Sequence, residues 1–447
     1  MRTLRSMIAS IGAAALIAIT GTGVLAAPAE LSSPAADLRV ALGRLLGEHA
    51  ALAIEATRQG FDAGDLEDPE FVAAAGALQG NTDDLVGAID SIYGADAAQA
   101  FRAQWEAHIG FFVDYTVGLV TEDTAAQDEA VADLTTYIED FGQFLSDATG
   151  GNLPADAAQG ALAEHVTQLK EQIDAYAAGD YETAYAKARE AYAHMFMTAD
   201  ALSLAIIQQD PDTFTGNDLA WSPAVDLEIA LQTLLGEHAI LAIEATRNGV
   251  SGAGDFEVSA GSLGGNTADL TAAITSVYGA DAGQAFNAQW EAHIGFFVDY
   301  TVVTAGGDDA AKQQAVDDLG TYVTDFGAFL GTATEENLPT EAAQSSLEAH
   351  VGQLAGQLDQ FFAEDYAAAY ASEREAYEHM FMTATALAAA IAGQFPAEFP
   401  TTTEPSDTAM AVPTSTSPSP VLLIGLVLAS VAGVALTRRA IEIRSRD

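Results

Sequence analysis

The 447-residue sequence contains no cysteine. A chain without thiols can form no disulfide, no thiolate metal site, no iron–sulfur cluster and no covalently attached c-type haem. Basic residues are also scarce, because 16 lysines and arginines stand against 64 aspartates and glutamates, for a net charge of −48. Such a surface repels nucleic acid and anionic lipid and concentrates cations. A salt-adapted or very soluble exported protein carries the same charge, so composition excludes nucleic acid as a partner and selects no particular ligand.

The signatures of common enzyme classes are missing as well. The sequence has no Ser/His/Asp arrangement, no glycine-rich phosphate loop and no HExxH motif. It also lacks the alternating pattern typical of half-buried β-strands. We therefore expect a binding protein rather than an enzyme.

Both ends of the chain carry signals of export and anchoring. Residues 1–26 combine basic residues, an apolar stretch and a small-residue cleavage site, which predicts a secretory signal peptide. Residues 396–420 are rich in Pro, Ser and Thr, which predicts a disordered stalk. Residues 421–437 are uncharged and precede a basic tail over 438–447, which predicts one transmembrane helix with a cytoplasmic C-terminus. We expect a single-pass cell-membrane protein with the bulk of the chain outside the cell.

The remainder of the chain is an internal duplication. LLGEHAALAIEATR recurs as LLGEHAILAIEATR, FRAQWEAHIGFFVDYTV as FNAQWEAHIGFFVDYTV, and REAYAHMFMTADAL as REAYEHMFMTATAL. The first block recurs 189 positions later and the other two 185, so the second copy is four residues shorter between Arg247 and Asn266. We assign residues 27–209 and 224–395 to two helical repeats joined by a breaker-rich linker over 210–223. Each repeat is long enough to bury its own core.

Each repeat is predicted to be helical throughout. Apolar residues recur every three or four positions in long runs of the first repeat near 37–59, 96–120, 124–148, 155–178 and 181–208. A shorter helix is predicted over 82–92, opened by Asn81 and closed by Gly94. The second repeat follows the same scheme. The predicted fold class is all-α, with two tandem up-and-down helical bundles and one C-terminal transmembrane helix.

All eight histidines fall into pairs related by the duplication, and each copy places its four on four different predicted helices. Helical spacing points them inward, because the positions three, four and seven residues away are mostly apolar. Imidazole is the commonest side-chain metal ligand, and a bundle can bring distant segments to one point. We therefore predict one metal site per repeat, formed by His49, His108, His165 and His194 in the first and by His238, His293, His350 and His379 in the second.

Two further residue types recur beside the fourth histidine. Glu190 and Glu375 lie one turn before it, and Met197 and Met382 lie three residues after it on the same predicted face. We predict these side chains as auxiliary ligands and copper as the ion, because thioethers and imidazoles both suit copper. Zinc in an all-histidine site and non-covalent haem are alternatives. The Glu-x-x-His spacing of di-iron bundles is absent from the sequence, which disfavours that centre.

A structural interpretation competes with metal binding. The inward imidazoles could pair with carboxylates, and methionine is a routine gap-filler in helical cores. The candidate carboxylates are Glu190 and Glu375, one turn before the fourth histidine, and Glu48, Asp84, Asp114 and Asp140 with their counterparts Glu237, Asp269, Asp299 and Asp325. On this interpretation the chain is a structural or adhesive acidic ectodomain. A redox protein or electron carrier that uses the same centre is a third hypothesis.

The duplicated blocks also carry a resemblance. EHAxLAxEATR, WxxHIxFFVDYT and REAYxHMFMTA, present in both copies, resemble bacterial cell-surface helical-bundle repeats suspected of binding copper. The resemblance implies a copper-binding helical bundle. Together with the histidine pattern and the predicted anchor, it leads us to expect a membrane-anchored extracellular protein that captures, buffers or delivers the ion.

Overall fold

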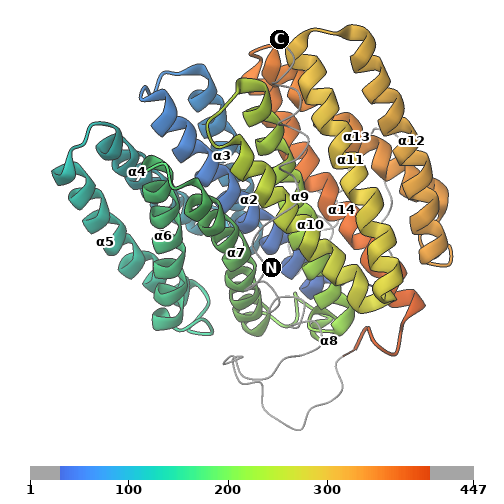
Figure 1. Cartoon of the computed structure of the whole chain (residues 1–447). Helices are drawn as coiled ribbons and strands as arrows, with labels where there is room; N and C mark the ends of the chain where they lie inside the picture. Colours follow the sequence, from blue (N-terminus) through green and yellow to red (C-terminus); the bar gives the residue numbers. More distant parts are fainter. Residues whose placement is uncertain (1–30, 403–447) are drawn as a thin grey trace.

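The computed structural model describes residues 31–402, which form an all-α fold of thirteen helices without a strand (Figure 1). The first repeat contains α2 (Pro34–Ala63), α3 (Pro69–Tyr93), α4 (Ala95–Val120), α5 (Thr124–Ala148), α6 (Ala155–Ala177) and α7 (Tyr181–Gln209). The second contains α9 (Pro223–Ser251), α10 (Phe256–Tyr278), α11 (Ala280–Gly306), α12 (Asp309–Ala333), α13 (Thr340–Phe362) and α14 (Tyr366–Gln394). The short α8 (Asn217–Ala220) connects them.

The predicted signal peptide, transmembrane helix and basic tail lie outside the described residues. Within residues 31–402, none of the helices combines the length and the apolarity needed to cross a bilayer.

Consecutive helices of each repeat are neighbours, and the last helix packs against the first to close a six-helix bundle. In the first repeat α2 also contacts α4 and α6, so it lies at the centre of its bundle. In the second repeat α9 contacts α11 and α13 and is likewise central. Both central helices are rich in leucine and alanine and bury most of their length. A helix that is apolar on most sides belongs in the middle of a bundle.

Local sequence signals set the helix ends. Ser33 caps α2 by accepting a hydrogen bond from the Ala36 amide, and Pro34 occupies the first turn. Gly64 ends the same helix with a φ of 61°, a left-handed conformation that glycine adopts without strain. Asp68 caps α3 through the amides of its first turn.

The helix predicted over 82–92 is the second half of a longer one, since α3 begins at Pro69. Asn81 was expected to open it, and that expectation is wrong. Its side chain is buried in mid-helix, where Nδ2 donates to the Leu45 carbonyl at 2.9 Å and to the Glu48 carboxylate at 2.8 Å. Alanine and glycine dominate the first half of α3, and such small residues leave little apolar periodicity in the sequence.

The linker over 210–223 is packed against the first repeat. Trp221, directly after α8, lies against the guanidinium of Arg39, whose Cζ is 4.3 Å from the ring centroid. Arg39 also reaches Asp226 at the start of α9, with Nη1 and Oδ1 2.7 Å apart. The linker therefore helps to fix the two repeats against each other.

The chain after α14 also folds back. Phe395 and Phe399 pack on the core of the second repeat, and the Pro400 carbonyl accepts a hydrogen bond from the Ala224 amide at 3.3 Å. The first residues of the predicted stalk, 396–400, thus belong to the folded region, and the rest of it, beyond residue 402, lies outside the described residues.

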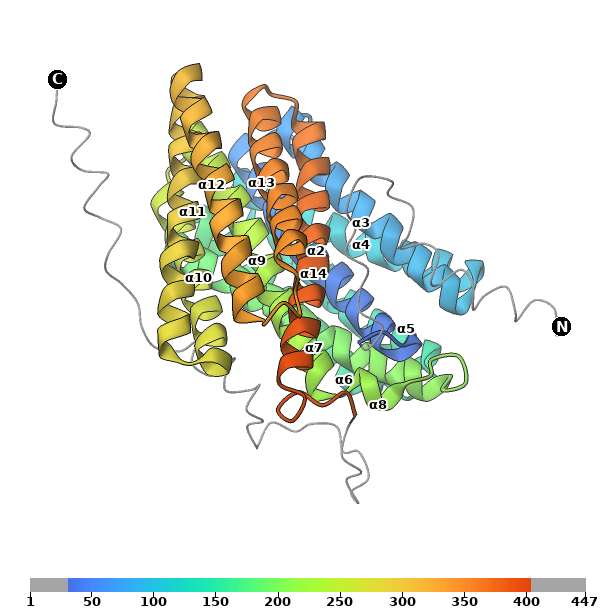
Figure 2. The same ribbon diagram turned by 90° about the vertical axis from the view of Figure 1, so that its right-hand side faces the viewer.

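The two repeats pack around an approximate two-fold axis (Figures 1 and 2). Helix α14 contacts α3 and α2, and in the reverse sense α7 contacts α10 and α9. Across this interface the rings of Phe196 and Phe381 stack with centroids 6.3 Å apart, and the hydroxyls of Tyr192 and Tyr377 are 3.1 Å apart. The arrangement has the form of an isologous dimer contained in one chain.

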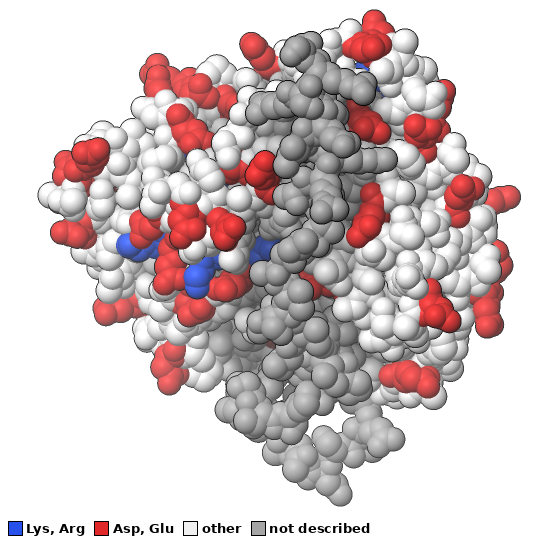
Figure 3. Space-filling model, viewed as in Figure 1, with Lys and Arg blue, Asp and Glu red and all other residues white. Residues whose placement is uncertain are grey.

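Acidic side chains spread over the face shown in Figure 3, with few basic ones between them. Part of the reason lies inside the molecule, because Arg39, Arg58 and Arg247 are buried at contacts between the repeats. These three arginines thus neutralise carboxylates between the repeats and are not available to offset the acidic surface.

Candidate metal centre

Three histidines meet in each repeat. One nitrogen each from His49, His108 and His165 all lie within 4.8 Å of one another, and all three side chains are buried. The Nε2 atoms of His49 and His108 are 3.4 Å apart. Two nitrogens bound at ~2.0–2.1 Å to a tetrahedral ion lie ~3.3 Å apart. This pair therefore already has the spacing of metal ligands, and a small movement of the third ring would complete the site.

The three rings come from the middles of α2, α4 and α6, and aromatic neighbours hold them. The Trp105 ring lies 4.5 Å from that of His49 between centroids. The Tyr137 ring stacks on His108 at 4.7 Å with an interplanar angle of 14°. These contacts restrict the rotation of both imidazoles and surround them with apolar surface.

Most ring nitrogens of this group have no hydrogen-bond partner among the described residues. They are Nδ1 of His49, Nδ1 of His108 and both nitrogens of His165. A buried polar atom without a partner costs ~1–3 kcal/mol. An ion between the converging nitrogens would bind Nε2 of His49 and His108 and one nitrogen of His165, and it would leave Nδ1 of His49 and His108 unpartnered. The cluster is therefore costly as a mere packing feature, and an ion would relieve part of that cost.

Burial keeps these imidazoles neutral. It lowers the pKa of His108 from 6.5 to about 3, and a weak interaction with the Trp105 carbonyl opposes this only in part. Burial, followed by the charges of His108 and His194, lowers the pKa of His165 to about 3. The pKa of His49 falls well below 6.5, because of burial and its two imidazole neighbours. Neutral imidazole is the form that binds metals, so the group can coordinate an ion at neutral pH without first losing protons.

The second repeat reproduces the arrangement with His238, His293 and His350, whose ligand atoms also lie within 4.8 Å of one another. Trp290 lies 4.7 Å from His238 between ring centroids, and Tyr322 stacks on His293 at 4.7 Å and 13°. Burial lowers the pKa of His293 to about 3 and that of the other two well below 6.5. Both repeats thus build the same neutral triad.

The fourth histidine of each repeat stays outside these groups. His194 Nε2 donates to the Ala161 carbonyl at 3.0 Å, and His379 Nε2 donates to the Ser346 carbonyl at 2.9 Å. The nitrogen that carries this proton cannot bind a metal at the same time. Four-histidine convergence was expected, and the structure forms a three-histidine group with the fourth ring held beside it.

The predicted auxiliary ligands lie at the surface. Met197 is 64% exposed and Met382 37% exposed, so the expectation that they share the inward face is wrong. Glu190 forms a surface ion pair with Lys187, and Glu375 is exposed. The neighbouring Met195 and Met380 are the buried ones. Helix α7 packs against α2, α6 and the other repeat, and its buried face includes His194 but not Glu190 or Met197.

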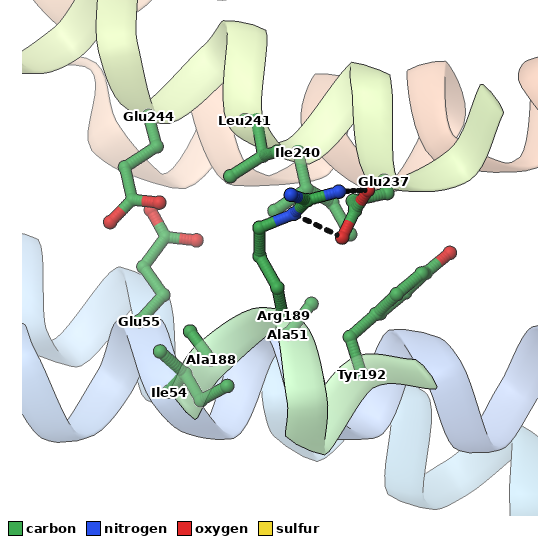
Figure 4. Close-up of a pocket in the computed structure, with 10 residues that line it drawn as sticks. All are labelled: Ala51, Ile54, Glu55, Ala188, Arg189, Tyr192, Glu237, Ile240, Leu241 and Glu244. Carbon is green, nitrogen blue, oxygen red and sulfur yellow. Dashed lines mark hydrogen bonds and ion pairs between the residues drawn. The ribbon is translucent and has the colours of Figure 1, made fainter. Parts of the chain in front are cut away.

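The carboxylates considered as histidine partners serve arginines instead. Arg374 donates to Glu48 at 2.8 Å and to Asp84 at 2.6 Å, across the boundary between the repeats. The reciprocal contacts, partly visible in Figure 4, join Arg189 to Glu237 and Asp269. Asp114 and Asp140, with Asp299 and Asp325 in the second repeat, are all exposed. The predicted histidine–carboxylate network therefore does not form with these residues.

A second group of charged residues lies at the interface and was not predicted. Arg58 pairs with Glu244, and Arg247 pairs with Glu55 at 2.6 Å and with Glu373 at 2.8 Å. Figure 4 shows Glu55 and Glu244 pointing toward each other beside a small cavity of about 40 Å³. The sequence contained a signal for these pairs, because both copies keep the block EATR. In the structure, the glutamate and the arginine of each block pair with those of the other repeat.

Comparison of the chain with protein-family models, with curated proteins and with solved structures finds no match. The case for a metal centre therefore rests on the geometry of the two histidine triads.

Proposed function

We propose that each repeat binds one transition-metal ion through its three buried histidines, and that the ion is copper. The observation that carries the proposal is the convergence of three buried imidazoles whose ligand atoms lie within 4.8 Å of one another, formed twice by equivalent helices. Isolated core histidines are common, but in both triads one ring, His165 or His350, has neither nitrogen partnered among the described residues, which supports a ligand there.

Charge favours monovalent copper over a divalent ion. Each group contains histidines and no carboxylate, so the ligand set is neutral. The electrostatic cost of burying an ion grows with the square of its charge, so Cu(I) costs about a quarter as much as a divalent ion of similar size. Imidazole suits copper well. Zinc would need an anion such as hydroxide to accompany it.

The acidic surface supports a role in capturing or buffering the ion, because it raises the local concentration of cations. The signal peptide and transmembrane helix predicted from the sequence would place this role at the outer face of the cell membrane. Delivery to a partner would then require release from a buried site.

Anaerobic titration of the purified protein with Cu(I), against a competing chelator, tests the proposal. We expect two equivalents for the wild type, one for His49→Ala and none for His49→Ala/His238→Ala. His194→Ala is the matched control and should keep two equivalents, because its ring lies outside the triad.

If the wild type binds stoichiometric zinc and no copper, the choice of copper is refuted, but the assignment of the triads as metal sites stands. Failure of the wild type to bind either metal would overturn the proposal and favour a structural role for the histidines.

A further inference from the structure

A cavity of about 180 Å³ adjoins the triad of the first repeat. It lies between α2, α3 and α4, and both His49 and His108 line it. Leu169, which follows His165 by one turn of α6, lines it too, so the helices of all three ligands border the space. Leu66, 43% exposed in the connection between α2 and α3, also lines the cavity, which therefore extends from the triad toward the surface.

The lining is apolar apart from the histidines. Alanine, leucine, isoleucine, valine and phenylalanine side chains make up most of it. Thr57 and Thr116 donate to carbonyls of their own helices at 2.9 and 2.8 Å, and Gln79 is directed to surface carboxylates. The polar groups of the lining other than the histidines therefore already have partners. A cavity whose wall is mostly apolar accepts small apolar molecules, as known cavities of ~150 Å³ do.

We propose that the metal centre of the first repeat binds a small neutral ligand, of the diatomic class that includes dioxygen and carbon monoxide, at a coordination position open to this cavity. The inference rests on the proposed function. Three protein ligands leave one position of a four-coordinate ion free, as in catalytic metal sites. An apolar space excludes hydrated ions and admits a neutral diatomic molecule, so the cavity selects the chemical class of the ligand.

Two probes test the cavity and the coordination step separately, in a His238→Ala background that leaves one site. Xenon, observed by NMR on the metal-free protein, reports the cavity. Carbon monoxide, observed by its infrared stretch on the Cu(I)-loaded protein, reports the open position. We expect both to bind. Ala56→Phe fills the cavity from its lining and should weaken both by at least tenfold, while one equivalent of copper is retained.

Ala245→Phe is the matched control at the corresponding position of the second repeat, and it should leave both probes unaffected. Ala53→Val is a milder change in the cavity lining that should give an intermediate loss if Ala56→Phe does not fold. A protein that binds copper but neither probe would overturn this inference and leave the proposed function intact. A protein that binds xenon but takes up no copper would overturn both the proposed function and this inference. The copper titration is the measurement that separates this outcome from the previous one.

Discussion

The two repeats keep the same triad while the structure around it differs. The centroids of His49 and His108 are 5.4 Å apart and those of His238 and His293 5.5 Å apart. The distance to the third ring is 5.7 Å in both repeats. The chain from the central helix to α10 is nevertheless four residues shorter than the chain to α3. The central helices and their partners thus set the ligand geometry independently of the connection that borders the cavity.

The interface between the repeats is symmetric in outline and asymmetric at one position. Glu373 of α14 joins the pair formed by Glu55 and Arg247, whereas Ala188 stands at the corresponding position of α7. One buried arginine therefore bridges two carboxylates, and Arg58, its counterpart, pairs with Glu244 alone. The two halves of this duplicated chain thus keep the same histidine triad but differ in the number of carboxylates that their buried arginines pair with.

Removing the bridging arginine should have the largest effect. Arg247→Ala leaves the Glu55 carboxylate without its counter-charge and the buried Glu373 carboxyl group without its partner, and we expect a loss of ~3–5 kcal/mol in the free energy of unfolding, measured by chemical denaturation. Arg58→Ala should cost less, because it leaves only one carboxylate, that of Glu244, without a counter-charge. The double variant Arg247→Ala/Glu373→Ala gives the second repeat the alanine of the first and should cost no more than Arg58→Ala. An unreduced loss in the double variant would show that Glu373 does not cause the asymmetry.

The triads should respond equally to acid. A histidine whose pKa falls from 6.5 to about 3 on folding binds its proton only in the unfolded state between these values, so stability is lost as pH falls below 6.5. His165→Leu and His350→Leu in the metal-free protein should each gain ~2 kcal/mol at pH 5 relative to their own effect at pH 8. Denaturation at both pH values measures this. Unequal gains would break the equivalence of the two triads.

Glu373 should give the second repeat a pH dependence of opposite sign. Burial, then the charge of Glu55, raises the pKa of Glu373 well above its usual value, although Arg247 opposes this. The folded state holds the proton where the unfolded state has lost it, so stability falls as pH rises above about 4.3. Glu373→Gln should flatten this slope by on the order of 1 kcal/mol per pH unit, and the exposed Glu375→Gln should not. A slope that survives Glu373→Gln would assign it to another carboxyl group.

The sequence predicts the helices and the inward direction of the histidines well, because the 3.6-residue period and the duplication record burial directly. It misses features that depend on how helices are rotated and paired. The exclusion of His194 follows from its hydrogen bond to the Ala161 carbonyl of α6, and no pattern within α7 encodes that contact. The long α3 is missed because alanines mark no apolar face, and Asn81 looks like a cap although its partners lie on α2.

The prediction of copper rested partly on two methionines, and their predicted positions are wrong because helical spacing alone does not show which residues a neighbouring helix covers. Met197 lies three residues after His194, which predicts a shared face, but His194 is buried and Met197 is 64% exposed. The charged blocks were likewise ambiguous. Glu48 and Arg374 recur in both copies, and sequence alone cannot separate retention for a ligand site from retention for an interface.

The smallest expected effect concerns the two tyrosines on the approximate axis. Tyr377 donates weakly to the Arg44 carbonyl at 3.4 Å, so its hydroxyl accepts the hydrogen bond from Tyr192, 3.1 Å away. Tyr192→Phe then removes a donor and leaves Tyr377 with its own acceptor, which should cost about 0.5 kcal/mol. Tyr377→Phe leaves the buried Tyr192 hydroxyl without a partner and should cost about 1–1.5 kcal/mol.

The double variant should cost no more than Tyr377→Phe, because the orphaned hydroxyl is then gone as well. Denaturation of the three variants completes a double-mutant cycle. Equal single losses that add in the double variant would show that the hydroxyls do not interact, and the axis would then be held by the stacked phenylalanines and the arginine pairs. The predicted inequality would instead show that a single hydrogen bond across the axis gives two otherwise equivalent helices different roles.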